Sequence, residues 1–123
     1  MKKVVTVTMG SSKKDFSFET EFLGQRFKVQ RLGADKEPRK AWELLRRQQA
    51  SADAIAVGDV ADHCHVGTTT IINRDTEKLL KVVTRVPVTT GAKLRRLLQV
   101  RAVRHVQREL GNYFNNNIVL FMS

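Results

Sequence analysis

The chain has 123 residues, of which 41% are hydrophobic and 28% are charged. This composition is typical of a single folded domain and excludes an intrinsically disordered tail. The formal net charge of +10 favours an anionic partner, and nucleic acid is one candidate.

Cysteine usage and hydropathy indicate the compartment. Cys64 is the single cysteine, so no internal disulfide can form, and a free thiol favours the reducing cytoplasm. The N-terminal sequence does not predict an export signal. The longest apolar run, at 118–122, is far shorter than the roughly 20 residues that a bilayer requires. We therefore expect a cytoplasmic protein with no membrane contact.

The first half of the chain predicts strands followed by a helix. Valines alternate with threonines over 3–9, which is typical of a β-strand. Apolar residues alternate on both sides of Leu23 and Gly24, which predicts a hairpin or two consecutive strands. Asp35 and Pro38 predict the start of a helix over 37–50 with one apolar face.

The second half alternates strands and helices. The continuous apolar run at 53–58 predicts a strand covered on both faces, and 65–72 predicts a small hairpin. Asp75 is expected to cap a helix that ends near Arg85, and a strand is expected at 86–89. Thr89 or Thr90 then caps a long helix that ends at Gly111. Residues 117–122 predict a final strand.

This order of elements predicts an α/β fold, Rossmann-like or flavodoxin-like, with a mostly parallel sheet, helices on both faces and a hairpin near the N-terminus. Residues 1–123 are expected to form one domain. The last strand lacks a following helix to cover it. We therefore expect the N-terminal part of a longer protein or, alternatively, a strand that pairs with a second copy.

Three strand-to-helix turns are the predicted ligand site, because carboxyl ends of parallel strands share one edge of a sheet. An anionic or polyhydroxylated small molecule is the expected ligand. The alternative is that they are polar turns and helix caps without a ligand. The predicted ligand-binding residues are Gly10, Ser11, Ser12, Lys13, Asp59, Thr89, Thr90, Gly91 and Lys93.

Two other kinds of site are weaker alternatives. The glycine spacing matches neither G-x-G-x-x-G nor G-x-x-x-x-G-K-[ST], so the sequence predicts no complete dinucleotide site. Asp59, His63 and His65 form a set of metal-ligand types, for which a structural loop is the alternative interpretation.

A basic face is predicted on the long helix near the C-terminus. It would bind nucleic-acid phosphates, or would be a solvated or docking face. Its residues are Lys93, Arg101, Arg104 and Arg108.

Several stretches carry a resemblance to a known group: VVTVTMGSSKKDF, FLGQRFKVQRLGAD, DAIAVGD, PVTTGAKLR and VQRELGNYFNNNIVLFMS. Together they resemble the N-terminal part of bacterial proteins described as quinate or shikimate 5-dehydrogenase-like. The resemblance implies a longer protein with a further Rossmann-type portion and NAD or NADP chemistry on a polyhydroxy acid. The chain lacks the N-V-T-x-P-x-K element of shikimate dehydrogenases, so the resemblance assigns no catalytic residue.

Overall fold

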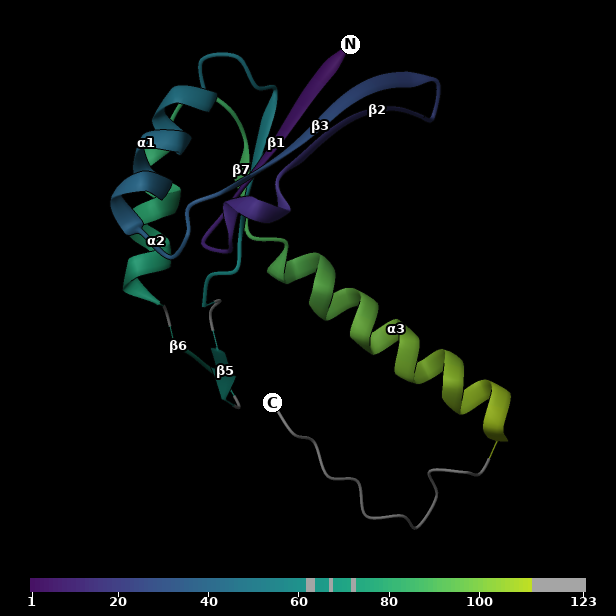
Figure 1. The fold of residues 1–123 in the computed structure, drawn as a ribbon. Helices are drawn as coiled ribbons and strands as arrows, with labels where there is room; N and C mark the ends of the chain where they lie inside the picture. The colour runs from purple at the N-terminus through teal and green to yellow at the C-terminus, as the bar shows by residue number, and fades with distance from the viewer. Residues whose placement is uncertain (62–63, 67, 72, 112–123) are drawn as a thin grey trace. The chain divides into compact units, whose positions relative to one another are not determined.

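The computed structural model describes residues 1–61, 64–66, 68–71 and 73–111, and for residues 64–66 and 70 it describes the backbone alone. The chain divides into two compact units, Met1–Gly91 and Ala92–Ser123. The first unit contains a five-stranded sheet with strand order β2-β3-β1-β4-β7. It also contains helices α1 and α2 (Figure 1). The second unit contains helix α3.

The centre of the sheet is parallel. β1 (Lys2–Thr8) pairs in parallel with β3 (Gln25–Gly33) on one side and with β4 (Ala54–Gly58) on the other. β4 in turn pairs in parallel with β7 (Val88–Thr89). The predicted mostly parallel α/β sheet is therefore confirmed.

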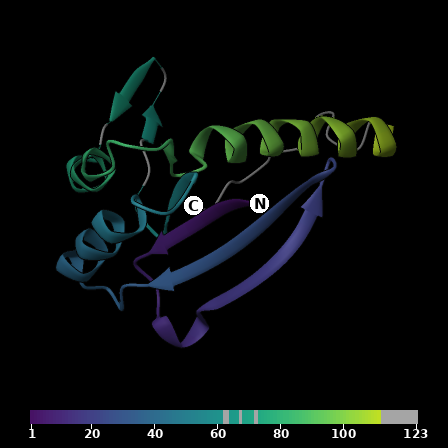
Figure 2. The ribbon, with the colours of Figure 1, turned by 90° about the horizontal axis from the view of Figure 1, so that it is seen from above.

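The predicted N-terminal hairpin is also confirmed. β2 (Phe16–Phe22) pairs antiparallel with β3 and lies at the outer edge of the sheet (Figure 2). Leu23 and Gly24 connect the two strands, and both have positive φ, 50° and 72°. A two-residue hairpin turn of this kind matches the twist of its strands, and glycine adopts the second position without strain.

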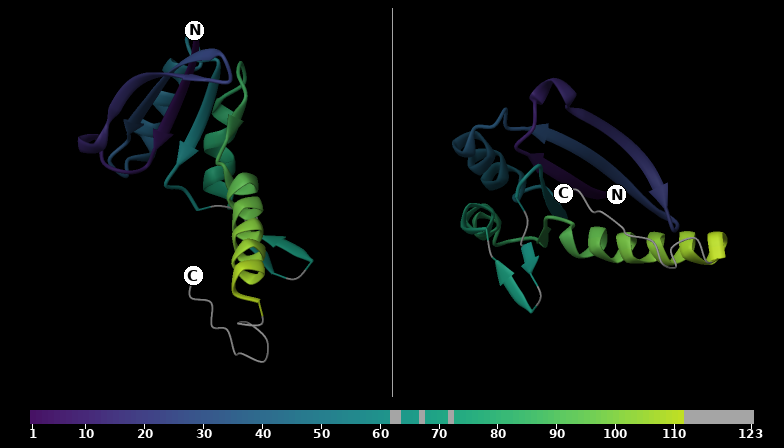
Figure 3. Two further views of the ribbon diagram at one scale, coloured as in Figure 1. Left: turned by 90° about the vertical axis from the view of Figure 1, so that its right-hand side faces the viewer. Right: turned by 90° about the horizontal axis from the view of Figure 1, so that it is seen from below.

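The two helices of the first unit cover one face of its sheet, whereas helices on both faces were predicted. α1 (Pro38–Gln48) connects β3 to β4, and α2 (Arg74–Val82) connects β4 to β7. Both crossovers run in the same direction across the sheet, so a right-handed connection places both helices on the same side. Figure 3 shows α1 and α2 together on that side.

The core lies between these helices and the sheet. Val5, Val7 and Ile55 point from the central strands and are fully buried. Leu45 from α1 packs among them, and it is one of the helix residues spaced to face the sheet. The alternation of β-branched residues in β1 therefore determines which face receives the helices.

The remaining elements include one that the sequence did not predict. A short 3-10 helix, η1 (Ser12–Lys14), follows β1. β5 (Cys64–Val66) and β6 (Thr69–Ile71) form a separate antiparallel pair, as predicted. α3 (Ala92–Leu110) ends before Gly111, which has φ 58° as expected for a C-terminal glycine. The predicted strand at 117–122 lies outside the described residues.

The predicted start of α1 at Pro38 is confirmed, but the expected start residues Asp35 and Asp75 do not cap their helices. α1 begins after Glu37, whose side chain makes no capping hydrogen bond, and Asp35 is engaged elsewhere. α2 is capped by Asn73, whose side-chain oxygen accepts a hydrogen bond from the Thr76 amide at 3.0 Å. Asp75 therefore lies in the first turn of α2. Both Asn73 and Asp75 suit a helix start, and only the backbone geometry distinguishes their positions.

Candidate functional site

The carboxyl ends of the four parallel strands meet at one edge of the sheet. β1 ends at Thr8, β3 at Gly33, β4 at Gly58 and β7 at Thr89. The Met9 amide donates to the Gly58 carbonyl at 3.1 Å, which ties the turn after β1 to the end of β4. Ligands of parallel α/β sheets bind at this edge.

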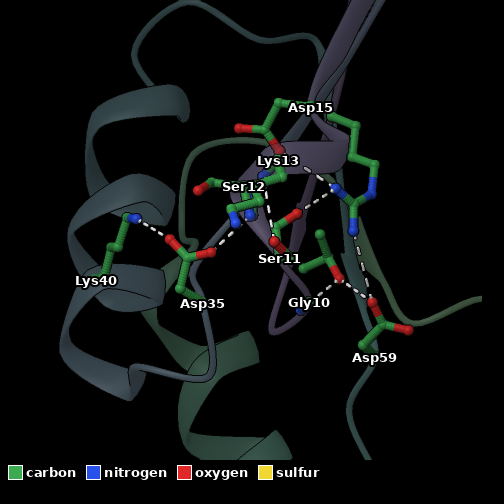
Figure 4. A network of polar contacts seen from close by, with 11 residues as sticks. Gly10, Ser11, Ser12, Lys13, Asp15, Asp35, Lys40 and Asp59 are labelled. Carbon is green, nitrogen blue, oxygen red and sulfur yellow. Dashed lines mark hydrogen bonds and ion pairs between the residues drawn. The ribbon is translucent and has the colours of Figure 1, made fainter.

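The turn after β1 uses its backbone donors internally (Figure 4). The Gly10 amide donates to the Thr8 hydroxyl at 3.0 Å, and the Ser12 amide donates to the Asp35 carboxylate at 2.6 Å. The Lys13 amide donates to the Ser11 hydroxyl at 3.2 Å. The turn therefore already holds an anion, and that anion is a carboxylate of its own chain.

Asp35 is held by two donors from different elements. Its other carboxylate oxygen accepts a hydrogen bond from the Lys40 ammonium on α1. That bond, followed by the one from the Ser12 amide, lowers the pKa of the Asp35 carboxyl from 3.8 to about 2. The same contact with Asp35 raises the pKa of Lys40. Asp35 thus fastens the turn after β1 to the first part of α1.

Arg31 occupies the centre of a second group of contacts. Its guanidinium lies 3.2 Å from Asp15 and 3.8 Å from Asp59, and it donates to the Ser11 carbonyl at 3.0 Å. The Thr8 hydroxyl also donates to Asp59. The structure thereby connects Asp59 to the Gly10–Lys13 turn, two parts of the predicted site that are far apart in the sequence.

Two glycines permit this close packing. A Cβ atom at Gly10 would lie 2.6 Å from an Asp59 carboxylate oxygen and 2.9 Å from the Arg31 guanidinium. A Cβ atom at Gly33 would lie 2.5 Å from the backbone of Ser11 and Ser12. Side chains at these positions would push apart the strand ends and the turn.

A groove of about 960 Å³ opens beside this network, between the first turns of α1 and α2 and the ends of β1 and β4. Its apolar lining includes Met9, Trp42, Val60 and Leu79. The volume lies at the upper end of the range for small-molecule sites. Among the residues predicted from the sequence, Asp59 lines the groove.

The groove also carries charged side chains from both helices. Its cations are Lys36 and Arg39 near α1 and Lys78 on α2, and its carboxylates are Glu43, Asp59 and Asp75. Lys78 lies 3.5 Å from Asp75. Lys36 and Arg39 have no carboxylate within salt-bridge distance among the residues that the structure describes.

Unusual backbone geometry gathers around the same groove. Asp35, Lys36 and Asp59 have φ of 54°, 63° and 51°, the left-handed region that non-glycine residues rarely adopt. Lys36 and Asp59 also line the groove. Strained backbone of this kind clusters at functional sites, so it supports the choice of this groove as the candidate site.

The third predicted turn is only partly included. Thr89 and Thr90 follow at the same sheet edge, and the Thr89 hydroxyl accepts a hydrogen bond from the Gly91 amide at 3.0 Å. Lys93 belongs to α3 in the second unit. The structure therefore assembles the first two predicted turns, while the role of Thr90 and Lys93 in binding stays a prediction.

The predicted metal ligands fall partly outside the description. His63 and the side chain of His65 lie outside the described residues, and Asp59 is paired with Thr8 and Arg31. In the part of the chain that is described, no three His, Cys, Asp or Glu side chains lie close enough to hold a metal ion.

Apart from Asp59, the sequence did not single out the groove residues. Trp42 and Arg39 lie on the helix that was predicted over 37–50, and both line the groove. One usable signal was their position in the first turns of a helix that follows a parallel strand, because such turns open at the ligand edge.

Comparisons place part of the chain in a family. The model described as Domain of unknown function (DUF8753) matches residues 3–90, which include the sheet, α1, α2 and the groove. A comparison with curated proteins found no match. Over the described ranges, the helices lack the combination of length and apolar character that crossing a membrane requires. By the match over 3–90, the chain belongs to the DUF8753 family.

Proposed function

We propose that this domain binds an anionic small molecule in the groove between α1 and α2. The observation that carries the proposal is the pair Lys36 and Arg39, which line a largely apolar groove and have no carboxylate partner among the described side chains. In a partly apolar groove an anionic group would gain charge-assisted hydrogen bonds from these cations. The ligand would lie at the sheet edge that parallel α/β folds use for binding.

In this proposal the Gly10–Lys13 turn lies beside the groove and does not bind the ligand directly. The Gly10 amide donates to Thr8 and the Ser12 amide donates to Asp35. We therefore propose the side chains of Lys36 and Arg39 as the hydrogen-bond donors to the anion. Lys13 is exposed and remains a candidate for long-range attraction of the ligand.

The dehydrogenase resemblance would imply an alternative, in which a polyhydroxy acid is the ligand and NAD or NADP is bound by another part of a longer protein. A dinucleotide pyrophosphate needs free backbone amides at a glycine turn. The Ser12 amide faces the Asp35 carboxylate, and Asp15 and Asp59 lie close to the same turn. The turn does not fit a pyrophosphate, so we derive no step through NAD or NADP.

The test is an NMR titration of the 123-residue chain with phosphate, gluconate and naphthalene-2-carboxylate. We expect saturable shifts at the Met9 and Val60 amides and the Trp42 indole N–H, which is the single indole signal of the chain. Replacing Arg39 with serine should weaken binding about tenfold, because one charge-assisted bond is lost.

Arg47 provides a matched control. It lies on the same helix, is exposed and does not line the groove. Arg47→Ser removes the same charge as Arg39→Ser, so it should leave binding within about twofold of the wild type if the site is local. Equal losses in both variants, or no shift with any of the three anions, would overturn the proposal.

A second candidate is nucleic-acid binding by α3. Its cations Lys93, Arg101, Arg104 and Arg108 are all exposed on a helix that bears one acidic residue, Glu109. Binding to the phosphate backbone should then weaken steeply as salt is raised. A flat salt dependence of RNA or DNA binding by the 123-residue chain would remove this candidate.

A further inference from the structure

The lining of the groove restricts the kind of anion that fits it. Met9, Pro38, Val60 and Leu79 contribute apolar surface, and Trp42 adds a large ring that is 43% exposed. A ligand covered with hydroxyl groups would leave several of them facing apolar atoms, and unpaired polar groups are costly to bury. A ligand with an apolar body matches this surface better.

Trp42 is positioned to receive a flat ring. The Arg46 guanidinium lies over the indole at 4.7 Å from its centroid, which occupies one face of the ring. The indole therefore has a cation over one face, and Trp42 also lines the groove. Aromatic rings pack well in offset or edge-to-face arrangements against such a surface.

The charged groups restrict the ligand further. Lys36 and Arg39 lie at the start of α1, which follows β3, whereas Asp59 follows β4. β1 separates these two strands, so their ends lie two strand spacings, or about 10 Å, apart. The carboxylates of Glu43, Asp59 and Asp75 all line the groove and would repel a second anionic group, and that of Asp59 can accept a hydrogen bond from a hydroxyl or amine.

We propose that the groove takes an aromatic monoanion, whose carboxylate or other acidic group lies near Lys36 and Arg39 and whose ring packs against Trp42. A hydroxyl or amine at the far end of the ring would donate to Asp59. The length of a two-ring aromatic acid is close to the roughly 10 Å between the ends of β3 and β4. This inference rests on the proposed function and specifies the ligand of the same site.

The experiment compares four probes by calorimetry and by the Trp42 indole N–H signal in the 123-residue chain. Naphthalene-2-carboxylate has a ring and a charge, naphthalen-2-ol has the ring without the charge, gluconate has the charge with hydroxyls, and phosphate has the charge alone. We expect naphthalene-2-carboxylate to bind at least tenfold more tightly than any of the other three. Adding a 6-hydroxyl group to it should improve binding further, and Asp59→Asn should reduce that gain.

Variants at the ring separate this inference from the proposed function. Trp42→Leu should weaken naphthalene-2-carboxylate about tenfold and leave gluconate within twofold. Arg46→Gln keeps the indole and its signal, so it should retain tight binding and serves as the control for folding. If gluconate binds as tightly as naphthalene-2-carboxylate and Trp42→Leu changes neither, the aromatic ligand is wrong while the anion site stands. If no probe binds, both proposals fail.

Discussion

Replacing Gly33 with alanine tests whether the close packing of β3 against the turn after β1 holds the sheet edge together. The new Cβ would lie 2.5 Å from the Ser11 carbonyl carbon and from the Ser12 nitrogen. Ordinary van der Waals contact begins at 3.4 Å, so the turn must move by about 0.9 Å. Both close atoms belong to backbone, which cannot rotate away as a flexible side chain can.

The expected cost is that of overpacking a tight site, about 1–3 kcal/mol of unfolding free energy. The displaced turn would also strain the bonds from the Ser12 amide to Asp35 and from the Gly33 amide to Asp15. Urea unfolding followed by circular dichroism measures the loss. For a unit of this size each kcal/mol lowers the melting temperature by about 4–8 °C.

Gly58→Ala is the matched control. Gly58 also ends a parallel strand, but a Cβ there would meet Thr8 at 3.4–3.5 Å, which is ordinary contact. Replacing glycine with alanine at a compatible position is neutral or stabilises by up to about 1 kcal/mol, because the unfolded chain loses freedom. If the two variants unfold within about 0.5 kcal/mol of each other, the reasoning from backbone contact is refuted.

Three further predictions concern the core, the Arg31 contacts and Asp35. Leu45→Ala should lower the free energy of unfolding by about 2–5 kcal/mol in urea, because Leu45 is fully buried; a loss below 1 kcal/mol would contradict its place in the core. Arg31→Gln should lower the free energy of unfolding by about 1 kcal/mol at low salt and by less at 1 M salt, because it leaves Asp15 and Asp59 without their shared cation. Equal losses of free energy at both salt concentrations would argue against an electrostatic role of Arg31. Because the pKa of Asp35 is lowered to about 2, the stability that this carboxylate contributes is present above pH 3.8 and is lost as the pH falls toward 2. Asp35→Asn should therefore make the melting temperature depend less on pH between these values. An unchanged slope would refute this prediction.

The sheet could be predicted from the sequence because its strands differ in pattern. The continuous apolar run of β4 predicted a strand covered on both faces in a parallel sheet; β4 does lie between the parallel strands β1 and β7, but only alternate residues of it are buried. The alternation on both sides of Leu23 and Gly24 indicated the hairpin. Local patterns do not say which strand pairs with which, so the placement of β3 beside β1 appears only in the structure.

Helix starts were less predictable because several residues near each start suit the same role. Asp35 was expected at the start of α1, but its carboxylate binds the Ser12 amide and Lys40. The competing partner comes from a turn 23 residues earlier in the chain. Capping preferences describe local competition alone, and a tertiary contact of this kind overrides them.

The groove illustrates the same limit for function. Arg39 and Trp42 lie on α1, whereas Asp59 lies in the turn after β4. No rule of sequence spacing connects these three residues. The strand-end rule predicted the correct edge of the sheet for the turns after β1 and β4. It could not say which helix would border the groove.

The turn after β1 decides where on this edge an external anion would be received. The Ser12 amide already donates to Asp35, and Lys40 neutralises that carboxylate. An anionic ligand at the same amide would have to displace Asp35 and would lie near the Asp15 carboxylate, so it would lose one favourable contact and gain a repulsive one. Lys36 and Arg39 require no such exchange, because neither forms an ion pair with a described carboxylate, although Glu43, Asp59 and Asp75 also line the groove. For the proposed anionic ligand, the internal carboxylate therefore favours recognition by the side chains of the groove over recognition by the glycine turn.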